Sequence, residues 1–377
     1  MSSGRVHFRG IVLGPSGYAG EGRDWLRALE GAGLAPSLEG ASFGGQLCEL
    51  PQDDLARIHL AAGRQRAVLA PTFHHVPAQA YVADPRTQWN VLRTMFETEG
   101  IPDSWHLPLS RADTIVVPSE PVRAAFVRSG IAAEKLRVLP PPLAVGMYPR
   151  PNEHRPRSGP FKILAIGEWT ARKAHDVLVA AFARAFRPGE AELWIKTSAS
   201  EDAVPRLQEE CARITRAHAP SSAPIVRTLC ATLNQDQMDR LYAACDVLAM
   251  PSRGEGWGRP VHEAMLRGIP VVATRAGSLA ALLPDEAHGW PVRSLVVPVE
   301  PRFAKELPLF SGQSWHEPDP QHLGALLREV FEQPEEAQRR AQRAWHHVRS
   351  LCAPDKIVRE LAEILGVTSG AAAAGSG

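Results

Sequence analysis

The stretch that decides the fold is "PSRGEGWGRPVHEAMLRGIPVVAT", residues 251–274 of a chain of 377 residues. It follows an apolar strand at residues 246–252 and combines a glycine-rich loop, a helix and a second short strand. Glu255 lies in the loop, and Glu263 follows eight positions later in the first turn of the predicted helix. A helix N-terminus presents unpaired N–H groups and a partial positive charge. Two acids therefore flank a predicted anion site.

A nucleotide sugar has the polarity of this arrangement, because its diphosphate lies between sugar hydroxyls and ribose hydroxyls. Carboxylates accept hydrogen bonds from hydroxyls, and backbone N–H groups bind phosphate oxygens. Gly256 and Gly258 would let the backbone approach such a ligand closely. Each acid also has a plainer interpretation: Glu255 as a surface loop acid, and Glu263 as a charge that a helix N-terminus favours.

Strands and helices alternate on both sides of a proline-rich stretch at residues 140–160. Before that stretch we predict strands at 6–13, 67–71, 114–119 and 136–140, and helices at 23–33 and 121–129. After it, the pattern restarts with "FKILAIG" at residues 161–167. This alternation predicts an α/β protein with two Rossmann-like, doubly wound domains. Ligands bind beyond the carboxyl ends of such strands, so we expect the domains to face a common cleft.

The predicted domain boundaries follow from this pattern. We expect an N-terminal acceptor-binding domain over 1–145, a linker over 146–160, a C-terminal donor domain over 161–350, a C-terminal helix over 351–367 that is a candidate to cross back to the first domain, and a disordered tail over 368–377.

Composition excludes several classes of function. The formal net charge is +1, so no global field would recruit nucleic acid, and membrane contact would be at most peripheral. The five cysteines are scattered and include no CxxC pair, which favours a reducing cytoplasm over a disulfide framework or a structural zinc site. No apolar run approaches the roughly 18 residues that a membrane span needs.

The stretch at 251–274 resembles the donor-site signature of the GT-B retaining glycosyltransferases of family four, in which seven residues separate two glutamates. "ILAIGEWTARKAHDVLVAAFARAF", residues 163–186, is similar to the first strand–helix unit of that family's donor domain. The resemblance implies transfer of a hexose-type sugar, with retention, from a UDP- or GDP-linked donor to an acceptor hydroxyl. It implies neither a metal nor another cofactor, and the chain contains no D-x-D pair.

The resemblance also implies roles for individual residues. Glu255 is then a catalytic candidate, and the donor-binding candidates are Arg172, Lys173, Gly256, Trp257, Gly258 and Glu263. Lys173 matches the family's lysine, which binds the diphosphate. Glu168 stands where the family usually has an arginine, so we expect Arg172 to supply the second positive charge.

The N-terminal half resembles the acceptor domain of one branch of this family, notably in "RTMFETEGIPDSW" at residues 93–105. Within "APTFHHVP" we expect His74 and His75 directly after a buried strand, where the family often has a histidine near the anomeric carbon of the sugar. Both are catalytic candidates, with His75 favoured, although a turn histidine stacked on Phe73 is the plain alternative. Glu97 is a candidate on the acceptor side.

The opening "IVLGPSGYAGEG", residues 11–22, has two interpretations. As a strand followed by a glycine-rich turn, with Glu39 about 20 residues later, it indicates an NADP-dependent reductase that uses the Gly14–Gly20 loop. It also resembles the family's first acceptor-side loop, which makes Gly17 and Tyr18 acceptor-side candidates. A non-catalytic nucleotide-sugar-binding protein is a third possibility. The sequence leaves the acceptor open among glycan, lipid, protein and small molecule.

Overall fold

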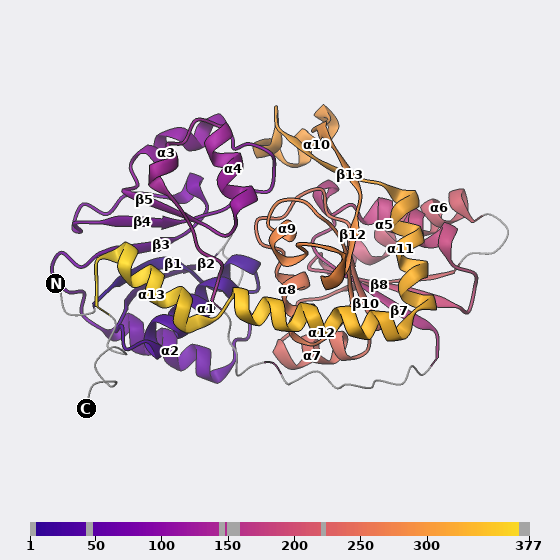
Figure 1. The fold of residues 1–377 in the computed structure, drawn as a ribbon, viewed down its shortest axis with the longest axis horizontal. Helices are drawn as coiled ribbons and strands as arrows, with labels where there is room; N and C mark the ends of the chain where they lie inside the picture. The colour runs from indigo at the N-terminus through magenta and orange to yellow at the C-terminus, as the bar shows by residue number, and fades with distance from the viewer. Residues whose placement is uncertain (1–4, 43–47, 143–147, 149–158, 220–223, 369–377) are drawn as a thin grey trace. The chain divides into compact units, whose positions relative to one another are not determined.

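The computed structural model describes residues 5–42, 48–142, 148, 159–219 and 224–368. The chain divides into two compact units. The first contains Met1–Phe96, Gly100–Met147 and Arg349–Gly377, and the second contains Glu97–Glu99 and Tyr148–Val348. Each unit has a six-stranded parallel sheet with helices packed on it (Figure 1). The predicted α/β fold with two Rossmann-like, doubly wound units is confirmed.

The first sheet has the strand order β2-β1-β3-β4-β5-β6. Its strands are β1 His7–Leu13, β2 Ser37–Ser42, β3 Thr72–His75, β4 Asn90–Arg93, β5 Thr114–Val117 and β6 Leu136–Val138, and the helices of this unit are α1 Gly17–Gly31, α2 Gln52–Gly63, α3 His106–Ser110, α4 Glu120–Arg128 and α13 Pro354–Leu365. Phe8, Trp25 and Phe73 form the centre of its core together with Leu361 of α13, which lies beside α1 (Figure 1).

The second sheet has the strand order β12-β11-β10-β7-β8-β9. Its strands are β7 Phe161–Ile166, β8 Ala191–Thr197, β9 Ile225–Cys230, β10 Val247–Met250, β11 Val271–Thr274 and β12 Trp290–Val292, and the helices are α5 His175–Ala185, α6 Val204–His218, α7 Gln235–Ala243, α8 Arg259–Leu266, α9 Leu279–Leu282, α10 Pro301–Glu306, α11 Pro320–Glu332 and α12 Pro334–Leu351. A separate antiparallel pair, β13 Ser294–Pro298 and β14 Ser314–Pro318, and a 3₁₀ turn, η5 Ala171–Lys173, complete the elements that position the site.

Two local predictions in the first unit were wrong. The helix expected to start near residue 23 begins at Gly17, because Ser16 caps it by accepting a 3.1 Å hydrogen bond from the amide of Ala19. Gly17, Gly20 and Gly22 therefore lie in the helix. A Cβ atom on Gly22 would lie 2.1 Å from the carbonyl oxygen of Ile11, so only glycine permits this approach of helix and strand. The strand expected at 67–71 is absent; Val68 is 92% exposed, and the strand begins at Thr72.

The contact-based division differs in detail from the predicted boundaries. Glu97–Glu99 groups with the second unit although it lies within the range expected for the first domain. The chain returns from the second unit to the first inside α12, between Val348 and Arg349. The predicted linker at 146–160 lies outside the described residues except at 148, 159 and 160, as does the tail beyond 368. Among the described residues, no helix has the length and apolar character needed to cross a bilayer.

Candidate functional site

The loop between β10 and α8 is buried along its whole length, from Pro251 to Gly258. Its carboxylate, Glu255, is only 5% exposed and contacts two cations from the turn η5. Lys173 Nζ lies 2.6 Å and Arg172 Nη1 lies 3.2 Å from the same oxygen, Glu255 Oε1. The structure thus brings together Arg172, Lys173 and Glu255, which the sequence singled out although Lys173 and Glu255 are 82 positions apart.

Burial and charge act against each other in this triad. Burial tends to raise the pKa of Glu255, but Lys173 and Arg172 hold that pKa below its ordinary value. Burial lowers the pKa of Lys173, while Glu255 acts in the opposite direction. For Arg172, Glu255 and Glu97 outweigh burial and raise the pKa. Because the two neighbouring cations lower its pKa, the buried Glu255 carboxylate is ionised at neutral pH.

The glycines of the loop have specific structural tasks. Gly258 adopts φ +85° at the N-cap of α8, and a Cβ atom there would lie 2.3 Å from Leu279 Cδ2. The carbonyl of Gly256 accepts a hydrogen bond from Ser278 Oγ. Trp257 is 2% exposed and donates a 3.0 Å hydrogen bond from Nε1 to His262 Nδ1. Trp257 is therefore a core side chain here, and its predicted donor contact would have to come from its backbone.

Glu263 is the fifth residue of α8 and is half-buried, so it lies beyond the first turn, in which the sequence analysis had placed it. Its Oε2 accepts a 3.1 Å hydrogen bond from the hydroxyl of Tyr242, and its Oε1 lies 3.4 Å from Arg259 Nη2. The hydrogen bond and the ion pair thus hold this side chain in one orientation on α8.

Glu97 packs in the second unit, beside the cations, although the sequence placed it on the acceptor side. A Cβ atom on Gly254 would lie 1.7 Å from the carbonyl oxygen of Glu97, so the two backbones touch. Burial and the neighbouring Glu255 raise the pKa of Glu97, against the effect of Arg172. Glu97 is therefore part of the carboxylate–cation cluster.

His75 is fully buried in β3 rather than following the strand. Its Nε2 lies 3.4 Å from Glu21 Oε1, which also accepts a 2.8 Å hydrogen bond from Nε of the fully buried Arg93. Although burial opposes it, Arg93 and His75 hold the pKa of Glu21 well below its ordinary value. His75 thus belongs to a buried ionic network in the core of the first unit.

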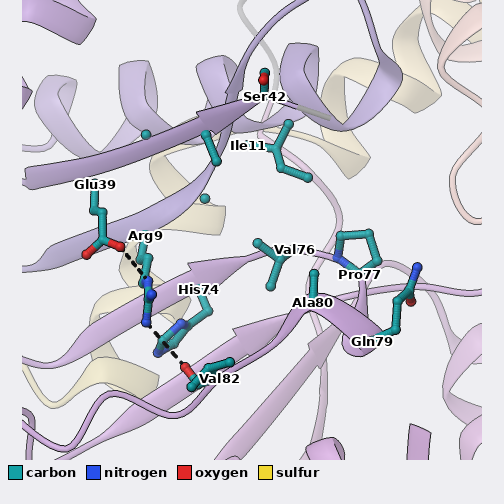
Figure 2. A pocket seen from close by; sticks show the side chains of 13 residues that line it. Arg9, Ile11, Glu39, Ser42, His74, Val76, Pro77, Gln79, Ala80 and Val82 are labelled. Atoms are coloured by element: carbon teal, nitrogen blue, oxygen red, sulfur yellow. Dashed lines mark hydrogen bonds and ion pairs between the residues drawn. The ribbon is translucent and has the colours of Figure 1, made fainter. Parts of the chain in front are cut away.

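His74 points to the opposite face of the same sheet, where a pocket of about 450 Å³ opens (Figure 2). Arg9 and Glu39 line the pocket beside it, joined by a 2.9 Å ion pair. His74 Nε2 lies 2.9 Å from Asn90 Oδ1, and burial lowers the pKa of His74 to about 4. Its imidazole is therefore neutral at neutral pH.

The remaining candidates lie in α1. Gly17 is the first helical residue, and the ring of Tyr18 is 5.2 Å from that of His75. The carbonyls of Val12 and Gly14 accept hydrogen bonds from Arg23 Nη1, at 2.9 and 3.1 Å, so an arginine occupies the turn that the reductase interpretation assigned to a cofactor.

Sequence reasoning missed Arg253, the residue that joins the two loops of the site. Its side-chain partners Glu317 and Ala171 are 64 and 82 positions away, so no local pattern indicates these contacts. Glu168, which stands in place of the expected arginine, is exposed.

Among the described residues, no group of three or more His, Cys, Asp or Glu side chains is placed to hold a metal ion.

Comparison with solved structures defines the class of fold. The structure of HepE from Anabaena in complex with UDP and glucose superposes with a TM-score of 0.64 at 17% identity, covering 96% of this chain and 99% of that one. The fold is that of the GT-B glycosyltransferases. Residues 160–307 of this chain match the sequence model of the family Glycosyl transferases group 1.

Two curated relatives share stretches of sequence with the chain. The sulfoquinovosyl transferase of Arabidopsis thaliana is 45% identical over 58 residues, which cover 15% of this chain and 11% of that protein. A D-inositol 3-phosphate glycosyltransferase of Streptomyces coelicolor is 27% identical over 317 residues, which cover 77% of this chain and 62% of that protein. The matches thus span less than two thirds of either relative.

Proposed function

We propose that the protein is a retaining glycosyltransferase that moves a hexose-type sugar from a nucleotide diphosphate to an acceptor hydroxyl. One observation carries this proposal: Lys173 and Arg172 converge on a single oxygen of Glu255, next to the N-terminus of α8. This geometry suits an anionic group bound to the cations with hydroxyl groups bound to the acids. The group 1 family match of the same segment supports it.

In the proposed reaction, the bond between the anomeric carbon and the diphosphate breaks, and the acceptor oxygen bonds to that carbon from the same face. The diphosphate leaves with the bonding electron pair, and its oxygens take up the acceptor proton. Lys173, Arg172 and the N–H groups at the start of α8 stabilise the charge that develops on the leaving group. These two cations do the work that a divalent ion does in other sugar transferases, so we propose a metal-independent reaction.

Glu255 and Glu263 then bind opposite ends of the donor. Glu255 accepts hydrogen bonds from the sugar hydroxyls, and Glu263 accepts them from the ribose hydroxyls. We propose a UDP- or GDP-linked donor from the resemblance to the family, and the HepE structure with UDP and glucose supports the UDP alternative. A cytoplasmic setting is proposed from the five free cysteines, four of which are buried.

A thermal-shift panel of UDP, GDP, their hexose conjugates and NADPH tests the proposal. A ligand at about 100 times its dissociation constant adds about 2.7 kcal/mol to the free energy of unfolding. We expect one nucleotide family, UDP or GDP, to stabilise the wild type and Lys305→Ala, an exposed control, but not Lys173→Ala. Stabilisation by NADPH alone would instead support a reductase. Donor hydrolysis or transfer by the wild type distinguishes an enzyme from a binding protein.

A further inference from the structure

Arg253 lies two residues before Glu255, and its side chain is only 4% exposed. Nε and Nη2 donate hydrogen bonds of 2.6 and 2.7 Å to the two carboxylate oxygens of Glu317 in β14. The rings of Phe303 and Trp315 have their centroids 5.4 and 5.3 Å from the guanidinium carbon. A forked ion pair, with the guanidinium packed against two aromatic rings, fixes the guanidinium in one orientation.

The remaining face of Arg253 is directed at the turn η5. Its Nη1 donates a hydrogen bond to the carbonyl of Ala171, and its backbone N–H donates a 2.7 Å bond to the carbonyl of Arg172. The turn ends at Ala174, which is fully buried and has φ +52°, a left-handed conformation that costs a non-glycine residue free energy. Surrounding contacts must therefore hold the turn in place.

The strand pair β13–β14 makes further contacts with Arg253. The amide of His316 donates a 2.9 Å hydrogen bond to the carbonyl of Arg253, and His316 Nε2 lies 2.8 Å from Glu99 Oε1. Arg253 thus connects β14 with the turn through both its main chain and its side chain. The turn η5 contains Arg172 and Lys173, whose side chains both contact Glu255.

We propose that Arg253 is a positioning residue, which directs Arg172 and Lys173 at one point where the diphosphate binds. This inference rests on the proposed function, because it takes that function's diphosphate as the ligand of the two cations. Phosphate binding by two cations requires both to reach the same oxygens, and small rotations of the turn separate them. Lysine at position 253 would keep the positive charge but could not bond Glu317 and Ala171 together.

The test compares Arg253→Lys with Arg340→Lys. Arg340 is a matched control, since it also stacks on a tryptophan, Trp290, and pairs with Glu329 and Glu336, but it does not contact the turn. Calorimetry measures the affinity for UDP, or for GDP if the wild type prefers it, and NMR measures the affinity for the free nucleoside. Hydrogen exchange reports on the amides of residues 168–176.

For Arg253→Lys we expect diphosphate affinity to fall about tenfold or more, nucleoside affinity to change less than about twofold, and the turn amides to exchange about tenfold faster. In a Lys173→Ala background the substitution should have little further effect on UDP affinity. The proposal is overturned if UDP affinity and turn exchange match Arg340→Lys, or if nucleoside and diphosphate affinities fall equally.

Two further outcomes remain decisive. If Arg253→Lys does not fold, Glu317→Gln, which keeps one acceptor oxygen, replaces it in the test. This variant should show a smaller loss of diphosphate affinity and a smaller increase in exchange of the turn amides. Unchanged diphosphate binding and unchanged exchange would overturn the proposal. If the wild type binds neither UDP nor GDP, the proposed function fails. Unchanged exchange at 168–176 would then separately refute the claim that Arg253 holds the turn.

Discussion

The ammonium group of Lys173 donates a 2.6 Å hydrogen bond to Oε1 of Glu255. The side chain proposed to bind the diphosphate is therefore paired with the side chain proposed to bind the sugar. Each is buried, which makes their interaction stronger than an exposed ion pair would be. A diphosphate must therefore compete with Glu255 for Lys173. When it succeeds, Glu255 becomes available to accept hydrogen bonds from the sugar. In the proposed complex, this exchange of partners would couple binding of the diphosphate to binding of the sugar.

Glu255→Gln should reduce sugar transfer by about 100-fold or more, because a neutral amide replaces the charged acceptor at the sugar. UDP affinity should stay the same or rise, since Lys173 and Arg172 lose their internal competitor. Steady-state transfer rates and calorimetry measure the two effects. Glu192→Gln is the control, as Glu192 pairs with Arg227 on β8 and β9. Full transfer activity in Glu255→Gln would refute the assigned role.

Glu263→Gln should weaken UDP binding by about tenfold to 100-fold, the range expected when a charge-assisted hydrogen bond is lost. The same change should have little effect on binding of 2′,3′-dideoxy-UDP, which lacks the ribose hydroxyls. Tyr242→Phe, which removes the 3.1 Å hydrogen bond that orients Glu263, should give a smaller loss in the same direction. Equal losses for UDP and its dideoxy analogue would exclude a ribose contact.

Gly254→Ala should destabilise the second unit by several kcal/mol or displace the Glu97 segment, because the new Cβ would lie 1.7 Å from a backbone oxygen. Gly31→Ala serves as a control, since a Cβ atom at Gly31 meets no other atom within 4 Å. Denaturant unfolding of both variants measures the difference. If Gly254→Ala were as stable as Gly31→Ala and bound UDP normally, the close backbone contact would be wrong.

The buried, neutral His74 should lower the free energy of unfolding as the pH falls. Its pKa is about 4 in the folded chain and 6.5 ordinarily, so the unfolded chain binds more protons between these values. Its contribution is thus lost as the pH falls from about 6.5 to about 4, by about 3 kcal/mol in total. His74→Gln should remove that part of the pH dependence of the free energy of unfolding. An identical pH dependence in both proteins would mean that His74 is not held neutral.

Much of the second unit could be predicted from the sequence, because the signals there are local. Residues 246–274 predict a strand, a glycine-rich loop, a helix and a second strand, in the order that the structure shows. Lys173 and Glu255 both follow parallel strands of one sheet and so lie at the same edge of it, but the ion pair between them was not predicted.

The first unit was harder to predict, because some apolar residues there are exposed and some polar residues are buried. "AVLAP" at 67–71 has the composition of a buried strand, yet Val68 is exposed, while the polar pair His74 and His75 lies inside β3. That strand has a polar face, towards the pocket, and an ionic cluster on the other face, so its sequence lacks the usual apolar run. Arg253 escaped prediction for another reason: its partner Glu317 is distant in sequence.

The most direct measurement of the central claim is a crystal structure of the protein with bound UDP or GDP. We predict that diphosphate oxygens lie within hydrogen-bond distance of Lys173 Nζ and Arg172, with a ribose hydroxyl on Glu263. A nucleotide bound instead beside Tyr18, or in the pocket lined by Arg9 and His74, with the Lys173–Glu255 pair unchanged, would contradict the account.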